Sequence, residues 1–223
     1  MSDGTFPHNL TEIDELTRRD HSYLLADDRC YFLGEYTARK GYGYSGTNQL
    51  IFNLKKPMNK RGTSQWVWKG RAIIKAARAL QSAIPDEWLD EATFVPIPPS
   101  KARDHPLYDD RMTQVLTRIT PTPNVCDCIL QGESTDAAHE LDNRPGPDDI
   151  AGRYGIDRSH CVPDPTFIVL CDDVLTTGAH YKGAQMIING AFPGVPVAGI
   201  FIARRVPETI DLVVLFGDDE DEV

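Results

Sequence analysis

The stretch "FIVLCDDVLTTGAHYKGAQMI" (residues 167–187) decides the fold that the sequence predicts. An uninterrupted apolar run leads through Cys171 to two adjacent aspartates, Asp172 and Asp173, and Thr-Thr-Gly follows two residues later. A short continuous apolar run is typical of a strand buried on both faces, expected here over 167–171, and the residues after the glycine have a helical pattern to about Asn189. Ligands of parallel sheets bind beyond the carboxyl ends of the strands, so we expect a binding site at this turn.

Strand and helix patterns alternate along the rest of the chain. The segment 66–84 carries apolar residues at helical spacing, and Pro85 ends it. A second helix is expected around 112–119, and further strands are expected at 92–98, 124–130, 197–203 and 212–216. This alternation predicts an α/β fold, a parallel sheet flanked by helices.

The chain divides by composition into three parts. Residues 1–27 are polar and are expected to be peripheral, residues 28–216 should form one domain, and the tail 217–223 is acidic. Within the domain, 28–60 predicts two extended segments around a glycine-rich turn at 41–46. The polar segment 131–150 is too long for an ordinary connection, and a flexible loop that closes over a ligand is expected there.

Composition excludes several classes of protein. The net charge of −10 argues against a broad nucleic-acid-binding surface, so nucleic acid is not expected to bind directly. The chain start lacks a signal-peptide pattern, and no apolar run approaches the ~20 residues of a membrane span. We therefore expect a cytoplasmic protein that does not interact with membranes.

Five cysteines are present, and they leave two interpretations open. Cys126 and Cys128 form a C-x-C pair, which Cys161 could extend into a metal site. The alternative is that they are ordinary half-buried strand cysteines, which the sequence favours.

The turn after the aspartates has the chemistry of a phosphate site. Backbone N–H groups at the start of a helix lack partners within the helix and carry the positive end of its dipole. Two threonine hydroxyls add donors, so the turn suits one phosphate group, although it is not a Walker A loop. Carboxylates cannot bind that phosphate, but they suit the vicinal hydroxyls of a sugar, a metal ion or a cationic anomeric carbon.

These features resemble a known family. "FIVLCDDVLTTGAH" is similar to the phosphoribosyl-pyrophosphate (PRPP) signature of the type I phosphoribosyltransferases. "FVPIPPSKARDHPLYDDRMTQVL" resembles the pyrophosphate-binding segment of their ComF-like branch, and "NQLIFNLKK" ahead of a helix fits the same branch. The resemblance implies a phosphoribosyltransferase-type sheet with a hood over the acceptor pocket, for which 28–60 is the candidate.

The resemblance also implies roles for individual residues. Asp172 and Asp173 would hold the ribose hydroxyls and, with Thr176, are the candidate catalytic residues. The 5-phosphate would be wrapped by Thr176, Thr177, Gly178, Ala179 and His180. The pyrophosphate would be approached by Ser100, Lys101, Arg103 and Arg111, and a cis bond before Pro98 or Pro99 would suit that loop.

Three departures from the family pattern limit these expectations. The cysteine-rich N-terminal module of ComF-like proteins is missing, so we expect no structural zinc. His180 stands where threonine is usual, and could either add a charge for the phosphate or shield the pocket. Thr176 replaces the acidic base of the hypoxanthine-guanine enzymes, which puts purine salvage in doubt.

The implied function is a Mg²⁺-dependent phosphoribosyltransferase that uses PRPP and an unidentified nitrogen nucleophile. Mg²⁺ would be held through the substrate, with Asp172 and Asp173 as candidate ligands. The alternative is a non-catalytic regulator or adaptor that senses PRPP or a ribose 5-phosphate type of ligand, linked to DNA uptake or defence. A protein partner or a homodimer would then be expected.

Overall fold

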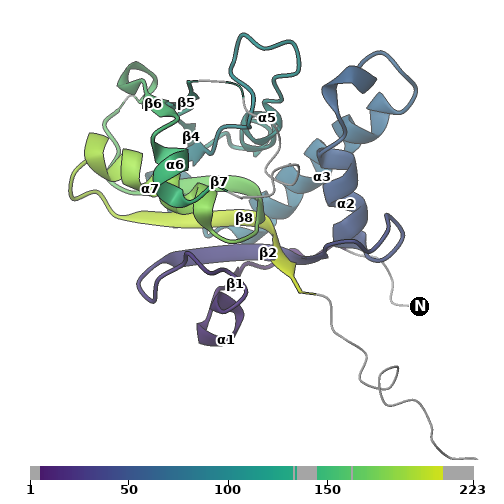
Figure 1. The fold of residues 1–223 in the computed structure, drawn as a ribbon, viewed down its shortest axis with the longest axis horizontal. Coiled ribbons are helices and arrows are strands. Elements are labelled where there is room, and N and C mark those ends of the chain that lie inside the picture. The colour runs from purple at the N-terminus through teal and green to yellow at the C-terminus, as the bar shows by residue number, and fades with distance from the viewer. Residues whose placement is uncertain (1–5, 133, 135–144, 162, 208–223) are drawn as a thin grey trace, which may run out of the picture.

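The computed structural model describes residues 6–132, 134, 145–161 and 163–207 (Figure 1). It is an α/β structure with a mostly parallel six-stranded sheet in the order β1-β2-β8-β7-β3-β4, flanked by helices. The strands are β1 (Thr11–Glu12), β2 (Arg29–Thr37), β3 (Thr93–Pro96), β4 (Asn124–Val125), β5 (Ile129–Gln131), β6 (Tyr154–Ile156), β7 (Ile168–Leu175) and β8 (Val197–Val206). The α-helices are α1 (Glu15–Arg18), α2 (Gly46–Leu54), α3 (Trp66–Ala83), α4 (Asp86–Glu91), α5 (Arg111–Leu116), α6 (Pro147–Ala151) and α7 (Ala179–Ala191).

The strand β7 lies inside the sheet, between β8 and β3, and runs parallel to both. Its alternate residues face opposite ways: Val169 and Cys171 pack into the core on the side of α2, α3 and α5, whereas Ile168 and Leu170 pack into the core beneath α7. Both faces are therefore covered, which explains why the sequence of this strand is apolar without alternation. The predicted parallel sheet is confirmed in this respect.

The same strand extends four residues beyond its predicted end. Asp172 pairs in register with Phe201 of β8, and the ladder continues to Leu175 opposite Arg204. The two aspartates thus lie within the strand rather than after it. The long neighbour β8 supplies the backbone partners that carry β7 past its polar residues.

The segment 28–60 differs from its prediction. The first half is β2, which lies inside the sheet and pairs with β8. The second half is not extended but forms α2: Ser45 caps its N-terminus by accepting from the Asn48 N–H. Leu50, Ile51 and Leu54 then bury one face of the helix. The prediction of a second extended segment after the turn is therefore wrong. The first half of the hood candidate is a strand of the main sheet.

The segment 124–130 also differs, because it is split between two sheets. β4 pairs with β3 at the edge of the main sheet, and β5 pairs antiparallel with β6 in a separate two-stranded sheet. Cys126 and Cys128 lie between β4 and β5 and are fully buried. They are therefore not half-buried strand residues.

Part of the predicted flexible loop 131–150 is packed. The helix α6 lies against α7, where Ile150 approaches so closely that a Cβ at Gly183 would meet its Cγ2 at 2.8 Å. Residues 133 and 135–144 of the loop fall outside the described residues, as do the expected strand 212–216 and the tail 217–223.

The N-terminal segment is more deeply packed than its composition suggests. Phe6, Ile13, His21 and Leu24 are buried, and β1 pairs antiparallel with β2. Both edges of the six-stranded sheet, β1 and β4, are only two residues long. None of the helices in the described part of the chain has the length and apolar character needed to cross a membrane.

Candidate functional site

A cleft of about 470 Å³ lies at the carboxyl ends of β3 and β7. Its volume is in the range that accommodates a small ligand, and its position agrees with the rule for parallel sheets. It brings together most of the residues that the sequence singled out: Ser100, Lys101, Arg111, Asp172, Asp173, Thr176, Gly178 and His180.

Asp173 is the centre of a charged network in this cleft. Its side chain is almost fully buried, and its Oδ2 accepts from Arg111 Nε at 2.6 Å and from Arg111 Nη2 at 2.5 Å. Lys55 Nζ lies 3.1 Å from its Oδ1. Burial alone would raise the pKa of Asp173, but Arg111 and Lys55 hold it well below the usual range. Asp173 is therefore an ionised carboxylate whose charge is compensated.

Asp172 has the opposite character. Burial, together with the charge of Asp173, raises its pKa to about 7, although Lys55 and Arg111 act against that rise. Its Oδ1 accepts from the Asp173 N–H at 2.7 Å. Near neutral pH this carboxyl group thus exists in both protonation states, and can donate as well as accept a hydrogen bond.

A second buried cation, Lys69, extends this network through Asp109. Lys69 is 1% exposed and donates to Asp109 Oδ2 at 2.7 Å and to the Leu54 carbonyl at 2.6 Å. Asp109 Oδ2 also accepts from Arg111 Nη1 at 2.9 Å. Arg111 is thereby held between two carboxylates and its guanidinium is fixed at the base of the cleft.

The turn that opens α7 is bound from behind by the N-terminal segment. His21 Nδ1 contacts the Thr176 carbonyl oxygen, and the Tyr23 N–H donates to the Thr177 carbonyl at 2.9 Å. In a trans peptide the C=O and the N–H point in opposite directions, and both peptide bonds are trans. The N–H groups of Thr177 and Gly178 therefore point away from the N-terminal segment.

Two features of this turn require a glycine at position 178. Its φ of +87° lies in the left-handed region, and a Cβ would come within 3.0 Å of Leu24 Cδ2. The neighbour that excludes a side chain is thus Leu24, where the sequence pattern led us to expect a phosphate oxygen.

His180 contributes a neutral ring to the cleft. Burial is the main cause that lowers its pKa, and the charge of Lys55 adds to it. Its Nδ1 lies 3.4 Å from the Tyr154 hydroxyl. Of the two roles considered for His180, shielding of the pocket fits this environment better than supply of a charge.

The pyrophosphate candidates are only partly brought together. Arg103 is turned toward Asp127, with Nη2 3.0 Å from the carboxylate and 2.7 Å from the backbone carbonyl. The expected cis bond is also wrong: the bonds before Pro98 and Pro99 are trans, and the cis bond of the described residues is at Thr120–Pro121.

Sequence reasoning missed Lys55 and His21. Lys55 follows directly after α2, in the "NLKK" end of the stretch used for the resemblance, so a basic residue there was available as a signal. His21 gave no signal, because its contact with residue 176 joins segments 155 positions apart.

The donor set of the cleft fits Mg²⁺ only in part. Mg²⁺ prefers oxygen ligands, and among the described residues Lys55 and Arg111 form their ion pairs in this cleft with Asp173 rather than with Asp172. Asp173 is already neutralised by Arg111 and Lys55. An ion would therefore be held chiefly through oxygens of a bound ligand, with Asp172 as the candidate protein ligand of the acidic pair.

No family model matches the chain, and the comparison with curated proteins finds no similar sequence.

Proposed function

We propose that the cleft binds PRPP and that the protein transfers its phosphoribosyl group to a nitrogen nucleophile. The observation that carries this proposal is the composition of the cleft, in which Asp173 binds two cations and the acidic pair shares the cleft with the turn that opens α7. PRPP presents the matching sequence of groups: a pyrophosphate, a diol and a 5-phosphate.

The orientation of two peptide groups just before α7 supports a phosphate subsite. The N–H groups of Thr177 and Gly178 point away from His21 and Tyr23, and they precede α7, a helix of 13 residues. Donors of this kind, with the helix dipole behind them, bind the oxygens of a phosphate. We assign them to the 5-phosphate.

The cations suit the pyrophosphate. Lys55, Lys101 and Arg111 line the same cleft, and Arg111 is held by Asp109 and Asp173 so that its orientation is fixed before a ligand arrives. A preorganised guanidinium loses little conformational freedom when it binds a phosphate oxygen. Mg²⁺, bound with the ligand, would neutralise the departing pyrophosphate.

The acidic pair divides its work in this proposal. Asp173 orients Arg111, whereas Asp172 accepts from or donates to a ribose hydroxyl and stabilises positive charge at the anomeric carbon. When the C–O bond to pyrophosphate breaks, pyrophosphate leaves, the nitrogen nucleophile forms a bond to that carbon, and the nitrogen releases its proton to solvent.

A second candidate, a PRPP-sensing regulator without catalysis, is favoured by one observation. Asp173 is already bound to Arg111 and Lys55, so one carboxylate of the pair is not available for a metal or diol without rearrangement. Such a site can hold its ligand and still lack a catalytic carboxylate.

Two measurements test these proposals. Calorimetry with PRPP and Mg²⁺ should show binding to the wild type and weaker binding to Asp172→Asn, because one charge-assisted hydrogen bond contributes roughly 1.5–3 kcal/mol. Asp164→Asn, at an exposed position away from the cleft, is the matched control. Equal affinity of the wild type and Asp172→Asn would remove the assignment of the site.

The second measurement separates the enzyme from the sensor. Pyrophosphate release is followed after PRPP is mixed with a panel of bases and amines. Release above the rate without protein supports transfer, and binding without release from any acceptor supports the sensor. Ribose 5-phosphate should compete with PRPP in either case, since it keeps the diol and the 5-phosphate.

A further inference from the structure

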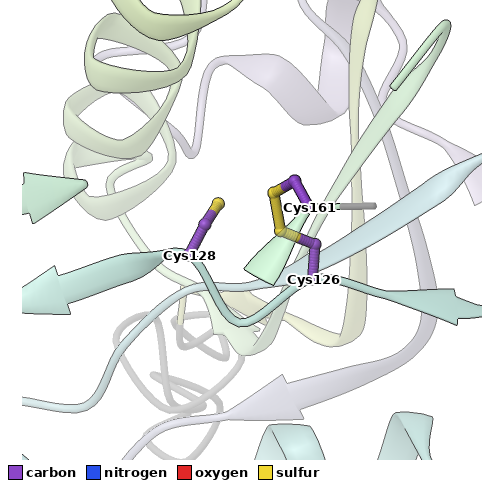
Figure 2. Close-up of side chains that lie close together, drawn as sticks. All are labelled: Cys126, Cys128 and Cys161. Carbon is purple, nitrogen blue, oxygen red and sulfur yellow. A yellow bond between two sulfur atoms is a disulfide. The ribbon is translucent and has the colours of Figure 1, made fainter. Parts of the chain in front are cut away.

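A cluster of three cysteines lies outside the chemistry proposed for the cleft. Cys126 and Cys161 form a disulfide, and the side chain of Cys128 lies beside it on the same segment as Cys126 (Figure 2). The three sulfur atoms lie within 4.8 Å of one another. Cys126 and Cys128 follow β4, whereas Cys161 comes from the segment after β6, so the cluster joins distant parts of the chain.

The surroundings of this cluster are those of a built site rather than a surface patch. Cys126 and Cys128 are 0% exposed and Cys161 is 4% exposed, and all three belong to the apolar core beneath α7. The remaining cysteines, Cys30 and Cys171, are also buried but stand outside the group. Burial alone therefore does not explain why three cysteine side chains lie together.

We propose that, when the disulfide is reduced, Cys126, Cys128 and Cys161 bind one Zn²⁺ ion as thiolates. Three sulfur atoms this close can share one ion, since tetrahedral zinc has bonds of about 2.3 Å to sulfur. Thiolate ligands favour zinc over Mg²⁺ and Ca²⁺, which prefer oxygen. A water molecule can take the fourth position of an ion with three protein ligands.

The chemistry balances with a phosphine reductant. The S–S bond of Cys126 and Cys161 breaks, the phosphine supplies two electrons and becomes the phosphine oxide, and water supplies the oxygen and two protons. Three thiols result. Binding of Zn²⁺ forms three Zn–S bonds and releases three protons to solvent, so the affinity should rise with pH.

The ion would replace the disulfide as a cross-link. Cys128 is followed directly by β5, and Cys161 follows β6 and the 3₁₀ turn Arg158–His160, so a bound ion would fasten the β5–β6 sheet to the main sheet in reducing conditions. This proposal departs from our expectation that the chain lacks a structural zinc site, and takes up the metal-site interpretation of the C-x-C pair instead.

The test uses the full chain, reduced with a phosphine under anaerobic conditions, and titrates it with Co²⁺ as a spectroscopic probe for Zn²⁺. We expect one equivalent to bind with sulfur-to-cobalt charge-transfer absorption, and Zn²⁺ to displace it. Cys128→Ser should bind at least tenfold more weakly and with reduced charge-transfer absorption, because only two thiolates remain, whereas Cys30→Ser, a buried cysteine outside the cluster, should bind as the wild type does. Circular dichroism checks that each variant is folded.

Either of two results would overturn the proposal: a folded, reduced wild type that binds no Co²⁺, or a Cys128→Ser variant that binds it unchanged. Should the variant fail to fold, X-ray absorption of the zinc-loaded wild type decides, since it requires no substitution. Three sulfur neighbours around the zinc are expected, and fewer than three would refute the site.

Discussion

Two adjacent carboxyl groups of one strand can differ in protonation when their neighbours differ. Asp173 is bound by Arg111 and Lys55, whereas Asp172 is buried beside a carboxylate that is already ionised. One strand therefore presents a fixed anion and a carboxyl group that titrates near neutrality, a combination that active sites use to assign separate roles to paired acids.

This difference predicts how stability depends on pH. The pKa of Asp172 is raised to about 7, so in the folded protein it keeps a proton that the unfolded chain releases above about pH 4. Its contribution to the free energy of unfolding is complete at low pH and is lost as the pH rises toward 7, by at most ~1.4 kcal/mol per pH unit.

Asp172→Asn removes this proton, and urea denaturation between pH 4.5 and 7.5 measures the result. The difference in stability, wild type minus variant, should fall as the pH rises. Comparing the two proteins cancels the opposite effect of His21 and His180, whose lowered pKa values make folding less favourable in acid. A difference that stays constant over this range would contradict the raised pKa.

Gly178 allows a second prediction at this scale. Gly178→Ala should reduce stability by about 1–2 kcal/mol for its left-handed backbone, with a further loss from the contact with Leu24. Gly194→Ala is the control, because its φ is +79° but a Cβ there meets nothing within 4 Å. Thermal denaturation should rank Gly178→Ala below Gly194→Ala, and equal losses would show that Leu24 gives way freely.

At the scale of the elements, the N-terminal segment has a role that the sequence did not predict. It orients the turn at 176–178 through a side chain, His21, and a backbone N–H, that of Tyr23. His21 Nε2 is buried and, among the described residues, has no hydrogen-bond partner. Burial lowers the pKa of His21, so the ring is neutral, with its proton on the nitrogen that faces the carbonyl.

His21→Phe should therefore loosen the turn. Phenylalanine fills a similar volume but cannot donate to the Thr176 carbonyl, so we expect faster hydrogen exchange at 177–179 and a several-fold weaker affinity for PRPP. Tyr23→Phe is a matched control, because Tyr23 contacts the turn through its backbone. Exchange at the turn that is equally slow in both variants would argue that His21 does not hold it.

The elements differ in how well the sequence predicts them. The helices α3 and α7 are evident because their apolar residues recur at helical spacing, and the first half of β7 is evident as a continuous apolar run. The helix α2 is missed because a run of tyrosine and glycine precedes it and favours extended structure, whereas its cap and the packing of Leu50 and Leu54 decide for a helix.

The site is predictable to the extent that it is local in sequence. The acidic pair and the turn lie within ten residues of one another in the sequence, and the cleft contains both. The contacts of Asp173 with Lys55 and Arg111, and of Thr176 with His21, bring together segments that no spacing relates. Partners set by tertiary structure could not be found from one sequence.

For the whole molecule, the Cys126–Cys161 disulfide is the covalent constraint among the described residues. It joins residues 35 positions apart, and closing a loop of that length stabilises a folded chain by about 3–4 kcal/mol. Reduction in the presence of a chelator should lower the urea midpoint accordingly. The double variant Cys126→Ser/Cys128→Ser, which leaves Cys161 without a neighbouring thiol of this cluster, is the control and should not respond to reductant; a wild type that also fails to respond would show that the bond is not formed in solution.

The short outer strands of the sheet affect how the molecule can associate with other copies of itself. A sheet grows by adding strands to unpaired backbone at its rim, and here each rim strand presents only two residues. Pro121 and Pro123, which lack N–H donors, stand just before the β4 rim. Among the described residues, each outermost strand thus offers a second molecule a template of only two residues, and self-association of the folded chain should rely chiefly on side-chain surfaces instead.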